Sequence, residues 1–171
     1  AFIYARRIFS SERENMELLD LRFSEKTLKI LKGMAGQVFE KYRCDPSIFH
    51  PVYLLPVGIY AGGKCYIMTQ EITDKAAGGK KTDVLEWIFR EAEEKEIHSS
   101  RPAVVQEDHA LQKEIKEVRI INEKKTLFRR GKAEYRVYLT KAVRFIFEKG
   151  YLQIRKPVYF SPFLNLEDDG E

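Results

Sequence analysis

The sequence predicts an α+β fold in which a mixed or antiparallel sheet with a central β-hairpin is packed by three to five helices. Two β-rich runs, VYLLPVGIY and CYIMTQEI, flank a Gly-Gly turn at residues 61–64, which is a good hairpin signal. Several longer stretches repeat apolar residues at the period of a helix. With 171 residues, the chain is long enough to bury a core without disulfides or a structural metal.

The first subdomain is predicted to span residues 1–97, in the order strand, helix, β-hairpin and helix. FIYARRIF, at residues 2–9, is rich in β-formers and predicts the first strand. Residues 16–44 repeat apolar side chains on one helical face, and Ser24 is a candidate N-cap for the second half of this helix. Pro46 is expected to end it, because the residue before a proline disfavours helical geometry.

The hairpin and a second helix complete this subdomain. Pro56 lacks a backbone N–H, so the first strand of the hairpin is expected to be kinked or to lie at a sheet edge. Thr82 is a candidate cap for a helix that runs to about residue 96, with an apolar face and an EAEEKE surface. We therefore expect two helices in the first subdomain.

A second subdomain, basic and built from helix and strand, is predicted at residues 98–160 and is expected to pack on the first. Apolar spacing predicts a long helix at residues 106–130, and a pair of strands over the same stretch is the alternative. Residues 132–150 fit both helical and alternating patterns, and residues 152–160 predict a final strand. Residues 161–171 form an acidic tail.

The positive charge of the chain is concentrated in one segment. The net charge is +4, but residues 112–160 carry 14 Lys and Arg against 5 Asp and Glu, whereas the acidic tail carries none against 4. A field of one sign attracts polyanions, and phosphate backbones are the commonest such partner. We therefore expect the C-terminal half to bind nucleic acid, either DNA or RNA.

Aromatic rings interleave with these cations. Single-stranded nucleic-acid sites use that combination, because any base can stack on a ring and any phosphate can pair with a cation. The same pattern also arises along a half-buried element, when rings point into the core and Lys or Arg stems cover its rim. The candidate binding residues are Lys124, Lys125, Arg129, Arg130, Lys132, Arg136, Tyr138, Lys141, Arg144, Tyr151, Arg155 and Lys156.

Two local patterns point to known nucleic-acid folds. Residues 145–160 predict a helix ended by glycine and followed by a basic strand, as in a winged-helix unit. Gly33 and Gly36 lie inside the first helical stretch, where each costs about 1 kcal/mol relative to alanine. A break there gives the order strand, helix, GxxG, helix, strand, strand, helix, which resembles a KH domain, whose GxxG loop grips nucleic-acid backbone. The alternative is one helix whose glycines allow close packing.

A glycine-rich loop precedes the second predicted helix. Its residues are Gly78, Gly79, Lys80, Lys81 and Thr82. Such a loop between a strand and a helix is a natural anion site, because exposed amides and the helix dipole point at it. It is not a Walker loop, because Lys81 stands where Ser or Thr should follow the lysine. A plain flexible connector is the alternative.

No catalytic signature is present, and neither a metal nor a cofactor is expected. Asp108, Glu114 and Lys116 form only a loose D…ExK pattern, which nucleases place on strands, whereas this stretch is predicted as helix. The three histidines are too dispersed for a recognisable metal cluster. Cys44 and Cys65 give no disulfide framework, and no apolar run approaches the ~20 residues of a membrane span. The prediction is a cytoplasmic protein without membrane contact.

An alternative function is protein assembly or regulation without catalysis. The predicted helix at residues 106–130 would pair with another protein or with a second copy as a homodimer, and Asn122 at the seam would control the register. Salt separates the two hypotheses, because phosphate contacts weaken steeply with ionic strength and an apolar seam does not.

Replacing Arg129 and Arg130 by glutamate should abolish nucleic-acid binding and leave the fold intact, because both cations are expected to contact phosphates. Fluorescence anisotropy with labelled oligonucleotides, from low to physiological salt, measures the binding, and circular dichroism checks the fold. Unchanged affinity would contradict the prediction.

Overall fold

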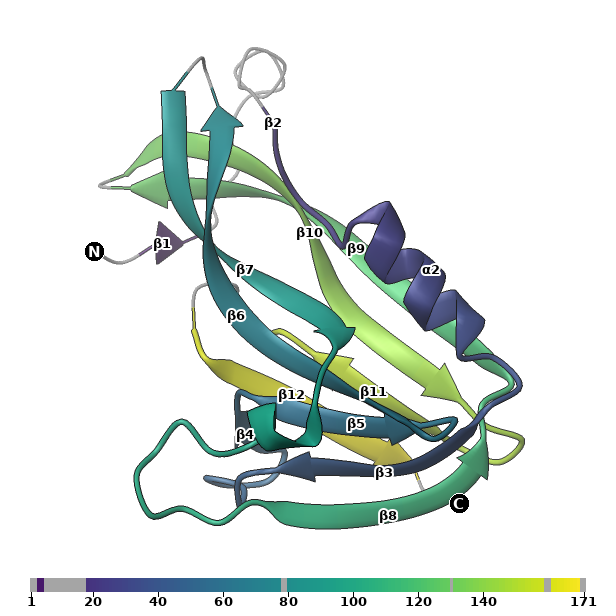
Figure 1. Cartoon of the computed structure of the whole chain (residues 1–171). Coiled ribbons are helices and arrows are strands. Elements are labelled where there is room, and N and C mark those ends of the chain that lie inside the picture. Colours follow the sequence, from purple (N-terminus) through teal and green to yellow (C-terminus); the bar gives the residue numbers. More distant parts are fainter. Residues whose placement is uncertain (1–2, 5–17, 78–79, 130, 159–160, 170–171) are drawn as a thin grey trace.

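The computed structural model describes residues 3–4, 18–77, 80–129, 131–158 and 161–169 (Figure 1). It is mostly β, with 61% strand and 9% helix, and its strands form two sheets. One α-helix lies in this described part, so the predicted α+β fold with three to five helices is wrong. No helix among these residues is long and apolar enough to cross a membrane.

Sheet A is the larger sheet and has seven strands. Its main path is β1 (Ile3–Tyr4), β9 (Glu117–Arg129), β10 (Lys132–Ile146), β11 (Tyr151–Arg155), β12 (Phe163–Asp169) and β4 (Val52–Leu54). These neighbours are antiparallel, and β2 (Leu18–Leu21) pairs in parallel with β10. The acidic tail thus supplies a strand, β12. Apart from β1, the strand predicted at residues 2–9 lies outside the described residues.

Sheet B has five antiparallel strands. Their order is β7 (Lys80–Glu91), β6 (Lys64–Ala77), β5 (Val57–Ala61), β3 (Val38–Cys44) and β8 (Glu107–Glu114). The predicted hairpin is confirmed, because Gly62 and Gly63, with φ of 57° and 75°, join β5 to β6. The expected kink at Pro56 is confirmed, because the run divides there into β4 and β5. The alternative of an edge position does not hold for β5, which lies between β6 and β3.

The two sheets share one hydrophobic core. Phe39 of β3, in sheet B, meets Phe145 of β10 edge to face, with 5.1 Å between ring centroids. Phe147, just after β10, makes a second edge contact with the Phe39 ring, with 6.0 Å between centroids. Phe39 and Phe145 are fully buried. These rings therefore hold sheet B against sheet A.

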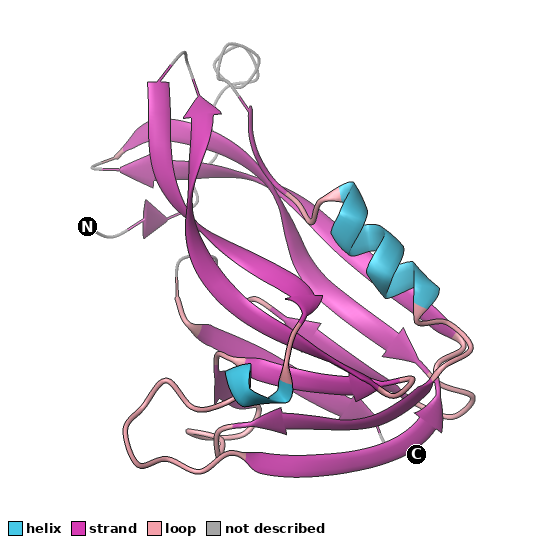
Figure 2. Cartoon of the chain, viewed as in Figure 1, coloured by secondary structure: helices cyan, strands magenta, loops and turns pink. Residues whose placement is uncertain are grey.

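The helix α2 (Glu25–Gly33) lies beside sheet A (Figure 2). Leu31 is fully buried, and Leu28 and Ile30 pack against the same core. The predicted N-cap is confirmed, because the Ser24 side chain accepts a hydrogen bond from the Thr27 N–H at 3.2 Å. The helix is thus fixed by its cap and by one apolar face.

Two long hairpins, β6–β7 and β9–β10, project at one end of the molecule (Figure 1). Residues 69–77 of β6 pair with β7 alone, and residues 132–141 of β10 precede its pairing with β11. At roughly 3.3 Å per residue, each projection is about 30 Å long. A small apolar cluster binds the hairpins together through Leu19, Leu21, Val84, Val137 and Leu139.

The helix predicted at residues 82–96 is wrong, because this stretch forms β7 and then a short 3₁₀ turn (Glu94–Glu96). Every residue of β7 pairs with β6, and Val84, Trp87 and Phe89 are buried. The β-branched and aromatic side chains suit a strand, and β6 supplies the cross-strand neighbours. The helical spacing of the sequence does not reveal that partner.

The helix predicted at residues 106–130 is also wrong, and the alternative of two strands describes the structure. The strands β8 and β9 belong to different sheets, and the chain crosses between them at Ile115, which is fully buried. Backbone hydrogen bonds fix this crossing: Gly36 N–H donates to Ile115 O at 2.7 Å, and Ile115 N–H donates to Gln37 O at 2.8 Å. The seam helix of the assembly hypothesis is therefore absent.

The described residues form neither of the nucleic-acid folds suggested by local patterns. The first helical stretch breaks at its GxxG segment, where Gly36 has φ of 87°, but β3 follows instead of the second KH helix. Phe39 and Tyr42 are buried on β3, and pairing with β5 and β8 overrides their helical spacing. Of the residues predicted as a winged-helix unit, 145–158 are described and hold the end of β10, a turn at Gly150 with φ of 81°, and β11, so this described stretch contains no recognition helix.

A buried carboxylate organises the long loop before β8. Asp45 is fully buried and accepts hydrogen bonds from Ser99 Oγ at 2.7 Å and Arg101 Nε at 3.1 Å. Gln106 Nε2 donates to its other oxygen at 3.2 Å. A buried charge is tolerated only when it is paired in this way, so Asp45 ties residues 99–106 to the end of β3.

Replacing Asp45 by asparagine should lower the free energy of unfolding by about 2 kcal/mol, because the charge that pairs with Arg101 is lost at a buried site. Urea denaturation measures this change. Ser99→Ala, which removes one neutral donor, should cost about 1 kcal/mol. A loss below about 0.5 kcal/mol for the asparagine variant, the range of ordinary surface substitutions, would refute the assigned role.

Candidate nucleic-acid interface

The predicted binding residues fall on strands of sheet A, but the structure separates them into groups. Lys124, Lys125, Arg136 and Tyr138 lie on the part of β9 and β10 that projects beyond β11. Lys141, Arg144, Tyr151 and Arg155 lie nearer the middle of the sheet. Each group has different neighbours, so the charges differ in availability.

The ring of Tyr138 carries two cations. The Arg22 guanidinium carbon lies 4.2 Å from the ring centroid, and the Lys124 ammonium lies 5.1 Å from it. Arg22 also donates two hydrogen bonds to the Asp20 carboxylate, at 2.9 and 2.8 Å, and this pairing lowers the pKa of Asp20. Tyr138 therefore already contacts cations of its own chain instead of presenting a bare ring for base stacking.

Two of the predicted cations share one carboxylate. Lys125 and Lys141 lie 3.4 and 3.2 Å from the same Glu123 oxygen. Lys141 is placed there by an irregularity in the β9–β10 register between Thr140 and residue 142. These lysines contribute less to an external field than their number in the sequence implies.

Arg144 and Tyr151 also form a contact within the chain. The Arg144 guanidinium carbon lies 4.4 Å from the Tyr151 ring centroid, and its Nε donates to Gln153 Oε1 at 2.9 Å. Arg155 is half-buried on β11. The second candidate stacking ring thus carries a cation as well.

Lys156 is buried and does not belong to a surface site. Only 3% of it is exposed, and its ammonium donates to the carbonyls of Val158, Ser161 and Phe163. Removal from water lowers the pKa of Lys156 to about 8. The side chain holds the segment between β11 and β12.

Two further predicted cations, Arg129 and Lys132, lie where β9 ends and β10 begins. Arg130 lies outside the described residues, as do the side chains of Arg129 and Lys132. The backbone places Arg129 opposite Lys132. Arg136 is half-buried on β10, between β9 and β2. The sequence therefore continues the positive charge of the projection toward its tip.

The predicted anion loop is not followed by a helix. Gly78 and Gly79 lie outside the described residues, as do the side chains of Lys80, Lys81 and Thr82. The backbone of these last three residues begins β7. No helix end is present there, so the dipole expected to attract an anion is absent.

The candidate binding residues chosen from the sequence do not include a row of lysines on α2. Lys26, Lys29 and Lys32 are exposed at i, i+3 and i+6, on the face opposite the buried Leu31. Among the described residues, none of the three has a carboxylate within 4.0 Å. Their spacing was visible in the sequence, but residues 1–111 are nearly balanced at 16 Lys and Arg against 17 Asp and Glu, which conceals the row.

A crevice of about 490 Å³ lies where α2 begins. It is lined by Asp20, Arg22, Phe23, Ser24, Glu25, Leu28, Lys75 and Asn122. Asn122 accepts a hydrogen bond from the Thr140 hydroxyl at 3.0 Å, so it is held within sheet A. Lys124 follows Asn122 by two positions on the same face of β9, toward the hairpin tip.

The loose nuclease pattern is not assembled into a site. Asp108 is bound by Lys41 at 2.9 Å and Arg43 at 2.6 Å, and the Arg43 guanidinium holds the pKa of Asp108 well below its usual range. Glu114 stands six positions further along β8, about 20 Å away for a strand. Burial raises the pKa of the Cys44 thiol to about 12, which keeps it protonated. In the described part of the chain, no three metal-binding side chains gather.

Stability should depend on pH through Lys156. Its pKa is about 8 in the folded protein and 10.5 when unperturbed, so the unfolded chain holds more protons between these values. The free energy of unfolding of the wild type, relative to Lys156→Met, should therefore rise by up to about 2 kcal/mol from pH 7.5 to pH 9.5. Urea denaturation at both pH values measures this difference. A constant difference would contradict the burial of the ammonium.

The chain was compared with protein families, with curated proteins and with solved structures. No family model, no curated protein and no solved structure matches it.

Proposed function

We propose that the protein binds nucleic acid through a basic strip made of Lys26, Lys29 and Lys32 on α2 and Lys124 on β9. The carrying observation is that, within the described residues, none of these four ammonium groups has a carboxylate within 4.0 Å. Elsewhere on the surface, lysines such as Lys41, Lys116 and Lys125 pair with acids. An unpaired row of one sign supports a polyanionic partner, because ordinary surfaces mix both signs.

The geometry of the strip suits a phosphate backbone. Three lysines on α2 span six residues, about 9 Å along a helix that rises 1.5 Å per residue. Like charges at this spacing repel one another by a few tenths of a kcal/mol, and a line of phosphates removes that repulsion. The strip leads from α2 toward the hairpin tip, where the sequence adds Arg129, Arg130 and Lys132.

The proposed contacts are to phosphates and not to stacked bases. Both candidate stacking rings, Tyr138 and Tyr151, already carry cations of their own chain. Single-strand sites depend on bare aromatic platforms, and phosphate contacts carry no sequence information. We therefore expect binding that is independent of base sequence, strongly dependent on salt, and at least as tight for duplexes as for single strands of equal length.

The double charge reversal Lys29→Glu/Lys124→Glu should weaken binding of a labelled 20-base-pair duplex at least ten-fold, because it removes two phosphate contacts from the strip. The slope of log affinity against log salt concentration should fall by about 2. Fluorescence anisotropy with duplex and single-stranded DNA and RNA measures both quantities.

The matched control is Lys64→Glu/Lys95→Glu, which makes the same change in net charge at exposed positions on sheet B and the 3₁₀ turn. We expect it to retain affinity within about three-fold, and circular dichroism checks the fold of both variants. Equal losses in the two variants would show only a general charge effect. That result, or no binding by the wild type at physiological salt, would overturn the proposal.

A further inference from the structure

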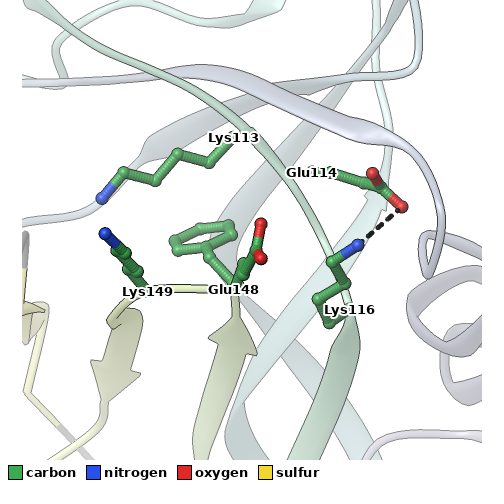
Figure 3. Close-up of a pocket in the computed structure, with 6 residues that line it drawn as sticks. Lys113, Glu114, Lys116, Glu148 and Lys149 are labelled. Carbon is green, nitrogen blue, oxygen red and sulfur yellow. Dashed lines mark ion pairs between the residues drawn. The ribbon is translucent and has the colours of Figure 1, made fainter.

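A second basic feature lies at the other end of β10, where the chain crosses from sheet B to sheet A. It is a hollow of about 250 Å³ (Figure 3). The lining residues are Lys113, Glu114, Lys116, Phe147, Glu148 and Lys149. They come from the end of β8, the crossing segment and the turn between β10 and β11. The hollow shares no residue with the basic strip.

The backbone around this hollow is tightly held. Lys116 N–H donates to Ile146 O at 2.7 Å, which joins the crossing segment to β10. Phe147 N–H donates to Gly150 O at 3.1 Å and closes the turn, where Gly150 has φ of 81°. The buried Ile115 fixes the other side of the crossing. The backbone that carries the lining side chains is therefore held in place, as a preformed binding site requires.

The ammonium groups of Lys113 and Lys149 point toward each other across the hollow (Figure 3). Lys116 is paired with Glu114 at 3.3 Å, but in the described part of the chain neither Lys113 nor Lys149 has a carboxylate within 4.0 Å. Two converging like charges repel unless an anion lies between them. The Lys113 ammonium also lies 5.5 Å from the centroid of the Phe147 ring, which forms an apolar wall.

We propose that this hollow binds the phosphate group of a small phosphorylated molecule between Lys113 and Lys149. Lysine binds phosphate as a point charge, so two converging ammonium groups suffice without a helix end or an arginine fork. This proposal does not rest on the proposed nucleic-acid function, because it uses different residues.

The size and the remaining charge of the hollow limit the ligand. A volume of about 250 Å³ exceeds the roughly 30 Å³ of one water, so there is room for a phosphate and a small organic part beside Phe147. Glu148 lines the same hollow and has no cation within 4.0 Å among the described residues. The negative charge of Glu148 disfavours a second phosphate, and its carboxylate oxygens can accept hydrogen bonds from hydroxyl groups. The site therefore favours a hydroxylated monophosphate over a polyphosphate.

The test uses backbone amide NMR of the full chain, titrated with ribose 5-phosphate, inorganic phosphate, pyrophosphate and ribose. Ribose 5-phosphate should shift the amides of residues 113–116 and 147–150 with the highest affinity of the four. Inorganic phosphate should shift the same amides more weakly, and ribose should leave them unchanged. Equal binding of pyrophosphate and ribose 5-phosphate would overturn the selectivity assigned to Glu148.

The double variant Lys113→Gln/Lys149→Gln should bind ribose 5-phosphate at least ten-fold more weakly. Its matched control, Lys64→Gln/Lys95→Gln, removes the same net charge elsewhere and should bind as the wild type does. Lys113→Arg/Lys149→Arg, which keeps both charges, should restore part of the affinity. The proposal would be overturned if ribose 5-phosphate shifted amides elsewhere in the chain, or if the control variant lost as much affinity. Oligonucleotide binding by the glutamine variant should stay intact, because the variant leaves the basic strip unchanged.

Discussion

The edge contact of Phe39 with Phe145 is the interaction on which the rest of the structure depends. It joins β3 of sheet B to β10 of sheet A, and Phe147 extends it by a second ring. Aromatic pairs of this geometry contribute about 0.5–1.5 kcal/mol beyond their buried area. Next to this contact, β8 pairs with β3, and the chain crosses to β9 at Ile115, whose backbone bonds to Gly36 and Gln37 just before β3.

The fold also decides which charges remain available. Within the sheets, several cations are matched by acids: Glu123 lies near two lysines, and Asp108 binds Lys41 and Arg43. Outside the sheets, the lysines of α2 face solvent without such partners in the described residues. A high count of Lys and Arg in a segment is therefore a weak guide to an interface, because strand pairing determines which of these cations lie next to a carboxylate and which remain unpaired.

The two proposed sites use lysine in different ways. On the basic strip, lysines are spaced along an exposed helix face, which suits an extended polyanion that contacts each of them in turn. In the hollow beside Phe147, two lysines converge on one volume, which suits a single compact anion. The same residue type thus serves two ligand classes, and the geometry of the backbone beneath it makes the difference.

The sequence by itself determined the local features of this protein: the Gly-Gly hairpin between β5 and β6, the Ser24 cap of α2, and the excess of positive charge near β9 and β10. Each depends on residues close together in the chain. Only the tertiary structure decided that residues 82–91 and 107–129 are strands, because partners far along the chain supply their pairing. It also decided that Lys156 is buried and that the side chains of Lys113 and Lys149 point toward each other, since both depend on how the two sheets pack.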